Sequence, residues 1–340
     1  MNIGDQSSVL SRRSQTDRRP RLRLRPRLRV RPRLRLVTAF APRIALIAAL
    51  ALITGSVLPG AQSRTHVVML GTGTPNADPD RYGPSVAIVV DDASYLVDFG
   101  VGVVRRAAAA ERAGFKALAA PNLTRAFATH LHSDHTLGLA DLILTPWILE
   151  RPTPLTLYGP RGLRAMSDHL IAAYADDIRI RTRGGEPKHQ YDPHLVTVHE
   201  IEPGMVYRDE RVTVTAFPVP HGAWEQAFGY RFQTPDRTIV VSGDTGPASH
   251  IEEQCQKCDV LVHEVYSEAG FSKRPPEWQA YHARYHTSTR QLGAIATRAQ
   301  PGLLVLYHQL IWSSTEEDLL QEVRSAYGGK VVSAHDLDVY

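Results

Sequence analysis

Cysteine is scarce in this chain of 340 residues, which has only Cys255 and Cys258, in the order CQKC. A disulfide-built scaffold and a four-cysteine metal site are excluded, because one CxxC supplies at most two thiolates. A redox-active pair would need a thioredoxin-like context, which the surrounding sequence lacks. We expect two cysteines carried by a helix without a catalytic role. A tight disulfide is the alternative if the chain is exported.

The N-terminal region lacks an apolar run of the roughly twenty residues that a membrane-spanning helix needs. Its apolar stretch, Ile44–Leu58, has about fifteen residues and follows an arginine-rich segment. This order is typical of a secretory signal, which we predict within 37–63, with an uncleaved membrane anchor as the alternative. We therefore expect a periplasmic, extracellular or membrane-anchored protein. A cytoplasmic location follows if this extension is not a signal.

Excess positive charge is confined to the N-terminus, although the formal net charge of the chain is +4. Twelve arginines lie in residues 1–36, and such a self-repelling segment is expected to be disordered. Residues 64–340 carry 26 basic and 33 acidic side chains, a formal charge of −7. Because nucleic-acid surfaces need clustered Lys and Arg, this balance argues against nucleic acid as a partner.

After residue 63 the pattern changes to short apolar runs separated by Gly, Pro and Asp. Runs such as HVVML (66–70), SVAIVV (85–90) and TIVVSGD (238–244) predict strands, and the alanine-rich segment 101–120 predicts a helix. Strands and helices are interleaved, with hairpins as well as crossovers. This order indicates one layered α/β domain over residues 64–340.

The strongest chemical signal is the segment THLHSDHTLG at 129–138. A strand that runs into a tight loop can point His130 and His132 at one metal ion. The following turn then presents Asp134 and His135 to a second position beside it. Four residues of ligand type within six positions predict a metal site rather than surface polarity.

Three further residues of ligand type, His221, Asp244 and His308, each end an apolar run. We expect all three at the sheet edge where the first cluster lies. Imidazoles with a shared carboxylate suit two Zn²⁺ ions per chain, and manganese or iron also fits. Two such ions about 3.5–4 Å apart can activate a shared water and clamp both oxygens of a displacement.

Motifs along the whole domain accompany HxHxDH in the order found in one family. This set resembles the metallo-β-lactamase superfamily, in its ribonuclease Z, zinc phosphodiesterase and arylsulfatase-like branch. The resemblance implies an αββα four-layer sandwich with a dinuclear site at one sheet edge. The motifs are GTGTP (71–75), LVDFG (96–100), LYGPRGL (157–163), PVPHG (218–222), SGDT (242–245), LVHE (261–264), HTS (286–288) and LVLYH (304–308).

The resemblance also implies a role for each ligand position. Asp244 would bridge both metals. Asp134 would be a metal ligand and a catalytic residue. Asp98 resembles the family's carboxylate that hydrogen-bonds a ligand histidine or the attacking water, with a plain strand-end turn as the alternative. The remaining ligands would be His130, His132 and His221 on the first metal and Asp134, His135 and His308 on the second.

Protonation of the leaving group requires a further acid. His286 in YHTST resembles the family's catalytic histidine, and Glu264 in LVHEV resembles the glutamate that orients it. A carboxylate beside the imidazole is expected to raise its pKa and fix its tautomer. His263 and His282 are the alternatives to His286. We expect the segment 266–285 to form a loop over the site.

The chain departs from ribonuclease Z in two motifs. The long arm by which that enzyme grips transfer RNA is replaced by a hairpin turn at Pro235–Arg237, and HQLIW follows the last metal histidine. The leading hypothesis is therefore a dinuclear-zinc phosphodiesterase acting on a small phosphodiester or related ester. The four tryptophans of the chain are candidates for the wall of the substrate pocket, with packing in the core as the alternative: Trp147, Trp224, Trp278 and Trp312.

Several alternatives stay open at this point. The first is a ribonuclease Z-type endonuclease that processes transfer-RNA 3′ ends. The same site could serve an arylsulfatase or a lactonase. A di-iron redox domain is disfavoured, because such domains carry glutamate where His132 stands, and β-lactamase activity is disfavoured because no cysteine ligand is available. A monomer and a homodimer both fit the sequence.

Overall fold

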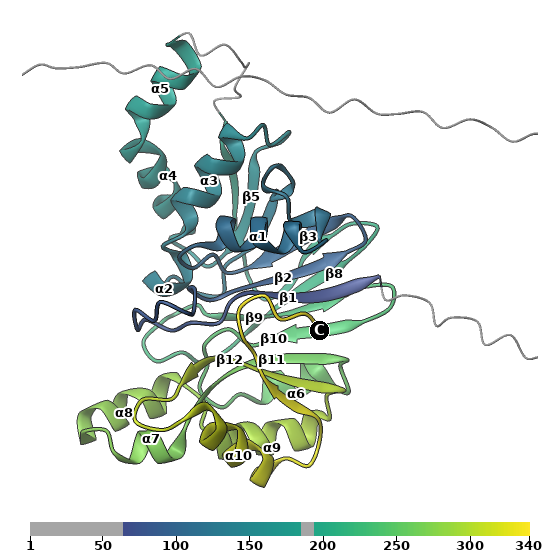
Figure 1. The fold of residues 1–340 in the computed structure, drawn as a ribbon, viewed down its shortest axis with the longest axis vertical. Coiled ribbons are helices and arrows are strands. Elements are labelled where there is room, and N and C mark those ends of the chain that lie inside the picture. Colours follow the sequence, from purple (N-terminus) through teal and green to yellow (C-terminus); the bar gives the residue numbers. More distant parts are fainter. Residues whose placement is uncertain (1–63, 185–193) are drawn as a thin grey trace, which may run out of the picture. The chain divides into compact units, whose positions relative to one another are not determined.

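Two β-sheets stacked face to face build the part of the chain that the computed structural model describes, residues 64–184 and 194–340 (Figure 1). The predicted leader (1–36) and the predicted signal or anchor (37–63) lie outside these residues. No helix within the described ranges is long and apolar enough to cross a membrane.

The first sheet has six strands in sequential order from β1 to β6. Its N-terminal strands are antiparallel, and the pairs β3–β4, β4–β5 and β5–β6 are parallel. Parallel strands end at the same edge, so the loops after β3, β4 and β5 meet there. The strands are β1 (Thr65–Gly71), β2 (Ser85–Val90), β3 (Ala93–Val97), β4 (Arg125–Phe127), β5 (Leu155–Gly159) and β6 (Val196–Glu200).

The second sheet has seven strands in the order β13-β12-β11-β10-β9-β8-β7. Strands β10 to β13 are parallel, and β7 to β10 form antiparallel hairpins. The expected hairpin between β9 and β10 is present. The strands are β7 (Gly204–Arg208), β8 (Thr213–Pro218), β9 (Phe228–Gln233), β10 (Thr238–Val241), β11 (Val260–Tyr266), β12 (Leu303–Leu310) and β13 (Val331–Ser333).

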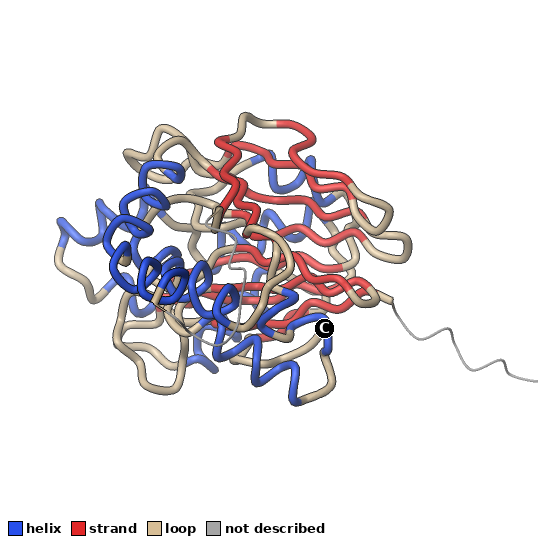
Figure 2. Tube along the Cα trace, turned by 90° about the horizontal axis from the view of Figure 1, so that it is seen from above, coloured by secondary structure: helices blue, strands red, loops and turns tan. Residues whose placement is uncertain are grey.

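Helices cover the outer face of each sheet, and the layers are visible from two directions (Figures 1 and 2). The helices are α1 (Val103–Arg112), α2 (Ser133–Thr136), α3 (Leu139–Ile148), α4 (Leu163–Ala173), α5 (Ala175–Arg183), α6 (Ser249–Cys255), α7 (Glu268–Ser272), α8 (Pro276–Tyr285), α9 (Thr289–Ala299) and α10 (Glu316–Ala326), with 3₁₀ turns at Lys116–Leu118 and Ala120–Asn122.

Three apolar layers follow from this arrangement. One lies between the first sheet and helices α1 and α3, and another between the second sheet and helices α6, α9 and α10. The third lies between the sheets, where Phe127 of β4 contacts the rings of Tyr230 and Phe232 on β9. This is the αββα sandwich that the resemblance implied.

Two local expectations were wrong. The segment 266–285 forms helices α7 and α8 rather than a loop, because Ser267 caps α7 and Pro276 starts α8 at a position where its missing N–H costs nothing. The cysteines do not share a helix: α6 ends at Cys255, and Cys258 follows in the next turn. The two sulfur atoms form a disulfide.

Candidate metal centre

The loop after β4 begins earlier than the sequence indicated. The strand was expected to run to His130 but ends at Phe127, because the Thr129 amide donates to the carboxylate of Asp98 at 2.7 Å instead of continuing the ladder. The chain then turns through the extended residue His132 into the short helix α2. His130 and His132 therefore precede the helix, and Asp134 lies in its first turn.

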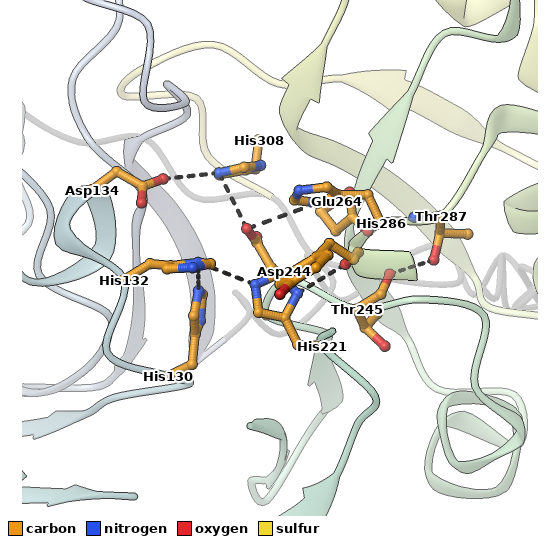
Figure 3. A network of polar contacts seen from close by, with 12 residues as sticks. His130, His132, Asp134, His221, Asp244, Thr245, Glu264, His286, Thr287 and His308 are labelled. Carbon is orange, nitrogen blue, oxygen red and sulfur yellow. Dashed lines mark hydrogen bonds and ion pairs between the residues drawn. The ribbon is translucent and has the colours of Figure 1, made fainter. Parts of the chain in front are cut away.

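Three imidazoles meet on one side of this loop (Figure 3). The Nδ1 atom of His132 lies 2.9 Å from Nε2 of His130 and 3.1 Å from Nε2 of His221. His221 comes from the second sheet, three residues beyond β8. Ligands about 2.0 Å from a tetrahedral zinc ion lie roughly 3.3 Å apart, so the spacing of these nitrogens fits one cation.

Asp244 lies between this triad and a second group (Figure 3). Its Oδ2 atom is 3.4 Å from Nε2 of His135 and 3.4 Å from Nε2 of His308. His308 also contacts Asp134, with 3.1 Å between Nε2 and Oδ2. All seven predicted ligand residues therefore converge, in two clusters suitable for metal binding that come from both sheets.

His308 reaches the site through a β-bulge. Glu264 of β11 pairs with Tyr307 and Val265 pairs with Gln309, which leaves His308 as the extra residue. Its backbone has a positive φ of 45°, a conformation that costs free energy for any residue other than glycine. Such strain at a buried histidine indicates a functional position.

Asp98 fixes the orientation of His135. The Nδ1–H of His135 donates to Oδ2 of Asp98 at 2.8 Å, which leaves Nε2 directed at the cluster. The same carboxylate accepts bonds from the amide and the hydroxyl of Thr129. Asp98 also has a positive φ, of 61°. It therefore contacts a cluster histidine, as the sequence predicted.

Buried polar atoms without a hydrogen-bond partner provide a test of whether the residues fit cations. Within the described ranges, Nε2 of His135 and Oδ1 of Asp244 are two such atoms. Leaving a buried polar atom unpaired is costly, so atoms that converge without partners suit a cation among them. Imidazole nitrogens and carboxylate oxygens are the donors that zinc, iron and manganese accept.

The two clusters differ in charge. Burial is the main cause that lowers the pKa of His130 well below its usual value and that of His221 to about 4, so this cluster has neutral rings. In the other cluster, burial opposes charge on Asp244, but His308 and His135 hold its pKa well below the usual range. Burial also opposes charge on His135 and His308, but the surrounding carboxylates, with Asp244 the strongest, together raise the pKa values of both rings.

His286 and Glu264 form a separate pair beside the cluster. The Nδ1 atom of His286 lies 3.4 Å from Oε2 of Glu264, whose Oε1 accepts from the Thr287 amide at 2.7 Å. The expected rise in the pKa of His286 is not found, because burial lowers it to about 4. Burial and the charge of Asp244 raise the pKa of Glu264 well above its usual value, which favours the protonated form of this side chain.

A cavity of about 380 Å³ opens over the second cluster. Asp134, His286 and His308 lie on its floor, and helix α8 forms one wall. Trp278 and Trp312 line this cavity, as one interpretation of the tryptophans expected. Trp147 is buried in the core, as the alternative interpretation expected.

Two hydrogen bonds that orient histidines of the first cluster were not predicted from the sequence. The Nδ1–H of His221 donates to the carbonyl of Tyr285 at 2.8 Å, which directs Nε2 at the triad. The indole N–H of Trp224 donates to Nε2 of His132 at 2.9 Å. The first could not be predicted, because every residue has a backbone carbonyl. The second depends on the folding of the Trp224 loop against the distant His132.

Comparison with known proteins gives a consistent result. Residues 94–309 match the family described as Beta-lactamase superfamily domain. Ribonuclease Z of Mycobacterium bovis BCG is 31% identical over 280 residues, which cover 80% of this chain and 96% of the relative. The short form of human tRNase Z has a similar fold, with a TM-score of 0.61 at 22% identity, over 81% of this chain and 98% of the other. The metallo-beta-lactamase fold protein YhfI of Bacillus subtilis has a TM-score of 0.60 at 17% identity, over 81% and 98%.

Proposed function

Since the chain belongs to the metallo-β-lactamase superfamily of hydrolases, we propose that it is a metal-dependent phosphodiesterase. The observation that carries this proposal is the convergence of seven His and Asp side chains beside the His286–Glu264 pair. The cluster supplies ligands for two cations, and the pair supplies a proton donor. A phosphodiester displacement needs both.

Asp244 would be shared by the two cations, which we propose to be zinc, with manganese or iron as alternatives. Two such ions, when bound, acidify an attacking water and stabilise charge on the phosphoryl oxygens. The chain's own part is to hold the ligands rigidly, through Asp98 at His135 and the Tyr285 carbonyl at His221. The ligands would be His130, His132 and His221 on one ion and Asp134, His135 and His308 on the other.

His286 would protonate the leaving oxygen. In this proposal Glu264 starts protonated and His286 starts as a neutral ring, the forms that burial favours for both side chains. Nδ1 of His286 faces Glu264, so its Nε2–H is the proton to transfer. As the leaving oxygen takes that proton, Nδ1 receives the proton of Glu264. The pair gives up one proton and Glu264 becomes a carboxylate.

Two substrate classes compete for this site. The relatives named ribonuclease Z favour an RNA 3′ end, since the chain covers nearly their whole length at 31% identity. The short β9–β10 hairpin, which replaces the family's RNA-gripping arm, favours a smaller phosphodiester. Of the two, we give the RNA substrate the stronger support, because it comes from similarity over 280 residues and not from one connection between two strands.

The test is hydrolysis by the full chain reconstituted with zinc. Two substrates are offered separately: bis(p-nitrophenyl) phosphate and a precursor transfer RNA with a 3′ trailer. Metal-dependent turnover of the first supports the reaction class, and endonucleolytic cleavage of the second supports the RNA substrate. His130→Ala should abolish both, whereas His250→Ala, at an exposed histidine of α6, should abolish neither. If wild type turns over neither substrate, the proposal is wrong.

A further inference from the structure

Arg274 occupies an unusual place between α7 and α8. Its guanidinium carbon lies 5.2 Å from the ring centre of Trp278 and 5.5 Å from that of Trp312. Cations at this distance from an indole are attracted to the ring, and two indoles hold the guanidinium in place. The side chain is therefore positioned in advance of any ligand.

No carboxylate within the described ranges forms an ion pair with Arg274, and its Nε atom is buried without a hydrogen-bond partner. A nearby cation behaves differently, because Arg81 pairs with Glu316 at 2.7 Å. Guanidinium groups that are partly buried usually find an anion, since two parallel N–H donors match a carboxylate or a phosphate. Within the described part of the chain, the side-chain donors of Arg274 are therefore available to a ligand.

Arg274 lines two adjoining cavities. One is the cavity of about 380 Å³ over the second ligand cluster. The other has a volume of about 550 Å³ and is also lined by Lys273 and Arg81. Asn76 and Trp312 belong to both walls. A molecule whose reacting group lies over the clusters can therefore extend past Arg274 into the second cavity.

His282 provides an independent sign of a polar ligand on the same wall. Its side chain lines the first cavity, is 7% exposed, and has neither ring nitrogen hydrogen-bonded within the described ranges. The ring lies 4.6 Å from that of Trp312. Two unpartnered nitrogens on a buried wall would be costly unless a ligand contacts them.

We propose that Arg274 binds a second phosphate group of the substrate, next to the phosphate that reacts at the metal clusters. The substrate class is then a phosphodiester with a further phosphate nearby, as in an oligonucleotide or a nucleoside bisphosphate. This inference rests on the proposed function, since it takes the clusters as the position of the reacting phosphate. Arg274 would determine specificity and take no part in bond cleavage.

The experiment compares two competitive inhibitors of bis(p-nitrophenyl) phosphate hydrolysis: thymidine 5′-phosphate and thymidine 3′,5′-bisphosphate. In the zinc-loaded wild type, the bisphosphate should bind more tightly by on the order of tenfold, the value of one charged hydrogen-bonded contact. Arg274→Met should reduce this ratio to about one. Arg274→Lys, which keeps the charge without the planar fork, should give an intermediate ratio. Arg284→Met, at an exposed arginine of α8, is the matched control and should keep the wild-type ratio.

Equal affinity of the two nucleotides in wild type would overturn the proposal, as would an undiminished ratio in Arg274→Met. Because Arg274 packs between two indoles, thermal unfolding is measured for each variant, and the Arg274→Lys ratio decides the outcome if Arg274→Met does not fold. Calorimetric titration of both nucleotides gives the same ratio without turnover. The role of Arg274 can therefore be judged even if the chain fails to hydrolyse the diester.

Discussion

His135 and Asp98 are joined by a hydrogen bond of 2.8 Å between Nδ1 and Oδ2, in a place where neither side chain reaches solvent. The bond fixes the ring so that its free nitrogen faces Asp134 and Asp244. An orienting carboxylate of this kind keeps a ligand histidine in the tautomer and direction that a cation requires.

Asp98→Asn should weaken zinc binding by roughly 10- to 100-fold while the fold is kept, because the amide no longer stabilises the oriented ring. The affinity is measured by competition with a chromophoric chelator. Asp209→Asn is the matched control: Asp209 also accepts several hydrogen bonds, from Tyr95, Tyr207 and two backbone amides, but lies outside the clusters. Equal losses in both variants would mean that Asp98 acts only through stability.

Zinc binding at neutral pH should release protons, up to two of them from the rings of His135 and His308. The pKa values of His135 and His308 are raised in the metal-free protein, and both rings must be neutral to bind a cation. Affinity should therefore fall as the pH is lowered. Calorimetry in two buffers with different heats of ionisation measures the number of protons released. A binding heat that is the same in both buffers would contradict this prediction.

Removal of metal should abolish hydrolysis and lower the melting temperature. Ligands that bind only the folded state stabilise it, by about 2.7 kcal/mol at a free concentration one hundred times the Kd. The measurement is thermal unfolding after chelation and after zinc is restored. An unchanged melting temperature would show that the clusters do not bind the ion in the folded chain.

His286→Gln should affect substrates according to their leaving group. Loss of a general acid costs roughly 10²- to 10⁴-fold in kcat when the leaving oxygen is a poorly stabilised alkoxide. The loss should be far smaller for p-nitrophenolate, which leaves without a proton. The ratio of kcat for an RNA dinucleotide and bis(p-nitrophenyl) phosphate is compared in wild type and variant. An equal loss on both substrates would assign His286 another role.

The metal-free protein should lose stability as the pH falls from about 6.5 to 4. Burial lowers the pKa of His263 to about 4, so in this interval the unfolded chain takes up a proton that the folded chain does not. The contribution is present above the unfolded pKa and is lost toward pH 4, at about 3 kcal/mol for this one group. Urea unfolding at pH 7 and pH 4.5 measures it. His263→Gln should reduce the difference between the two pH values, and His250→Gln should leave it unchanged.

The strands and the metal loop could be predicted from local patterns in the sequence, whereas the four-layer sandwich was implied by the family resemblance. Short apolar runs indicated the strands, and the spacing from His130 to His135 indicated the metal loop. These two features depend on residue types within a few positions of one another. They need no knowledge of how the strands are paired.

Other parts of the site depend on tertiary structure and were missed or wrong. The bulge at His308 exists only in the register between β11 and β12, which no single strand encodes. The pKa of His286 was expected to rise beside Glu264 but is lowered by burial, and burial depends on how the chain packs around the ring. The position of Arg274 between two indoles likewise depends on tertiary structure, because Trp278 lies in α8 and Trp312 follows β12.

The division of the ligands between the sheets has a consequence for how the molecule comes apart. Four ligand residues follow β4 of the first sheet. In the second sheet, His221 and Asp244 follow β8 and β10, and His308 lies in β12. Two bound cations would cross-link the two sheets. A small displacement of one sheet relative to the other would therefore inactivate the enzyme before either sheet unfolded. Hydrolysis would then depend on the relative position of the two sheets. Neither sheet with its helices would be active without the other.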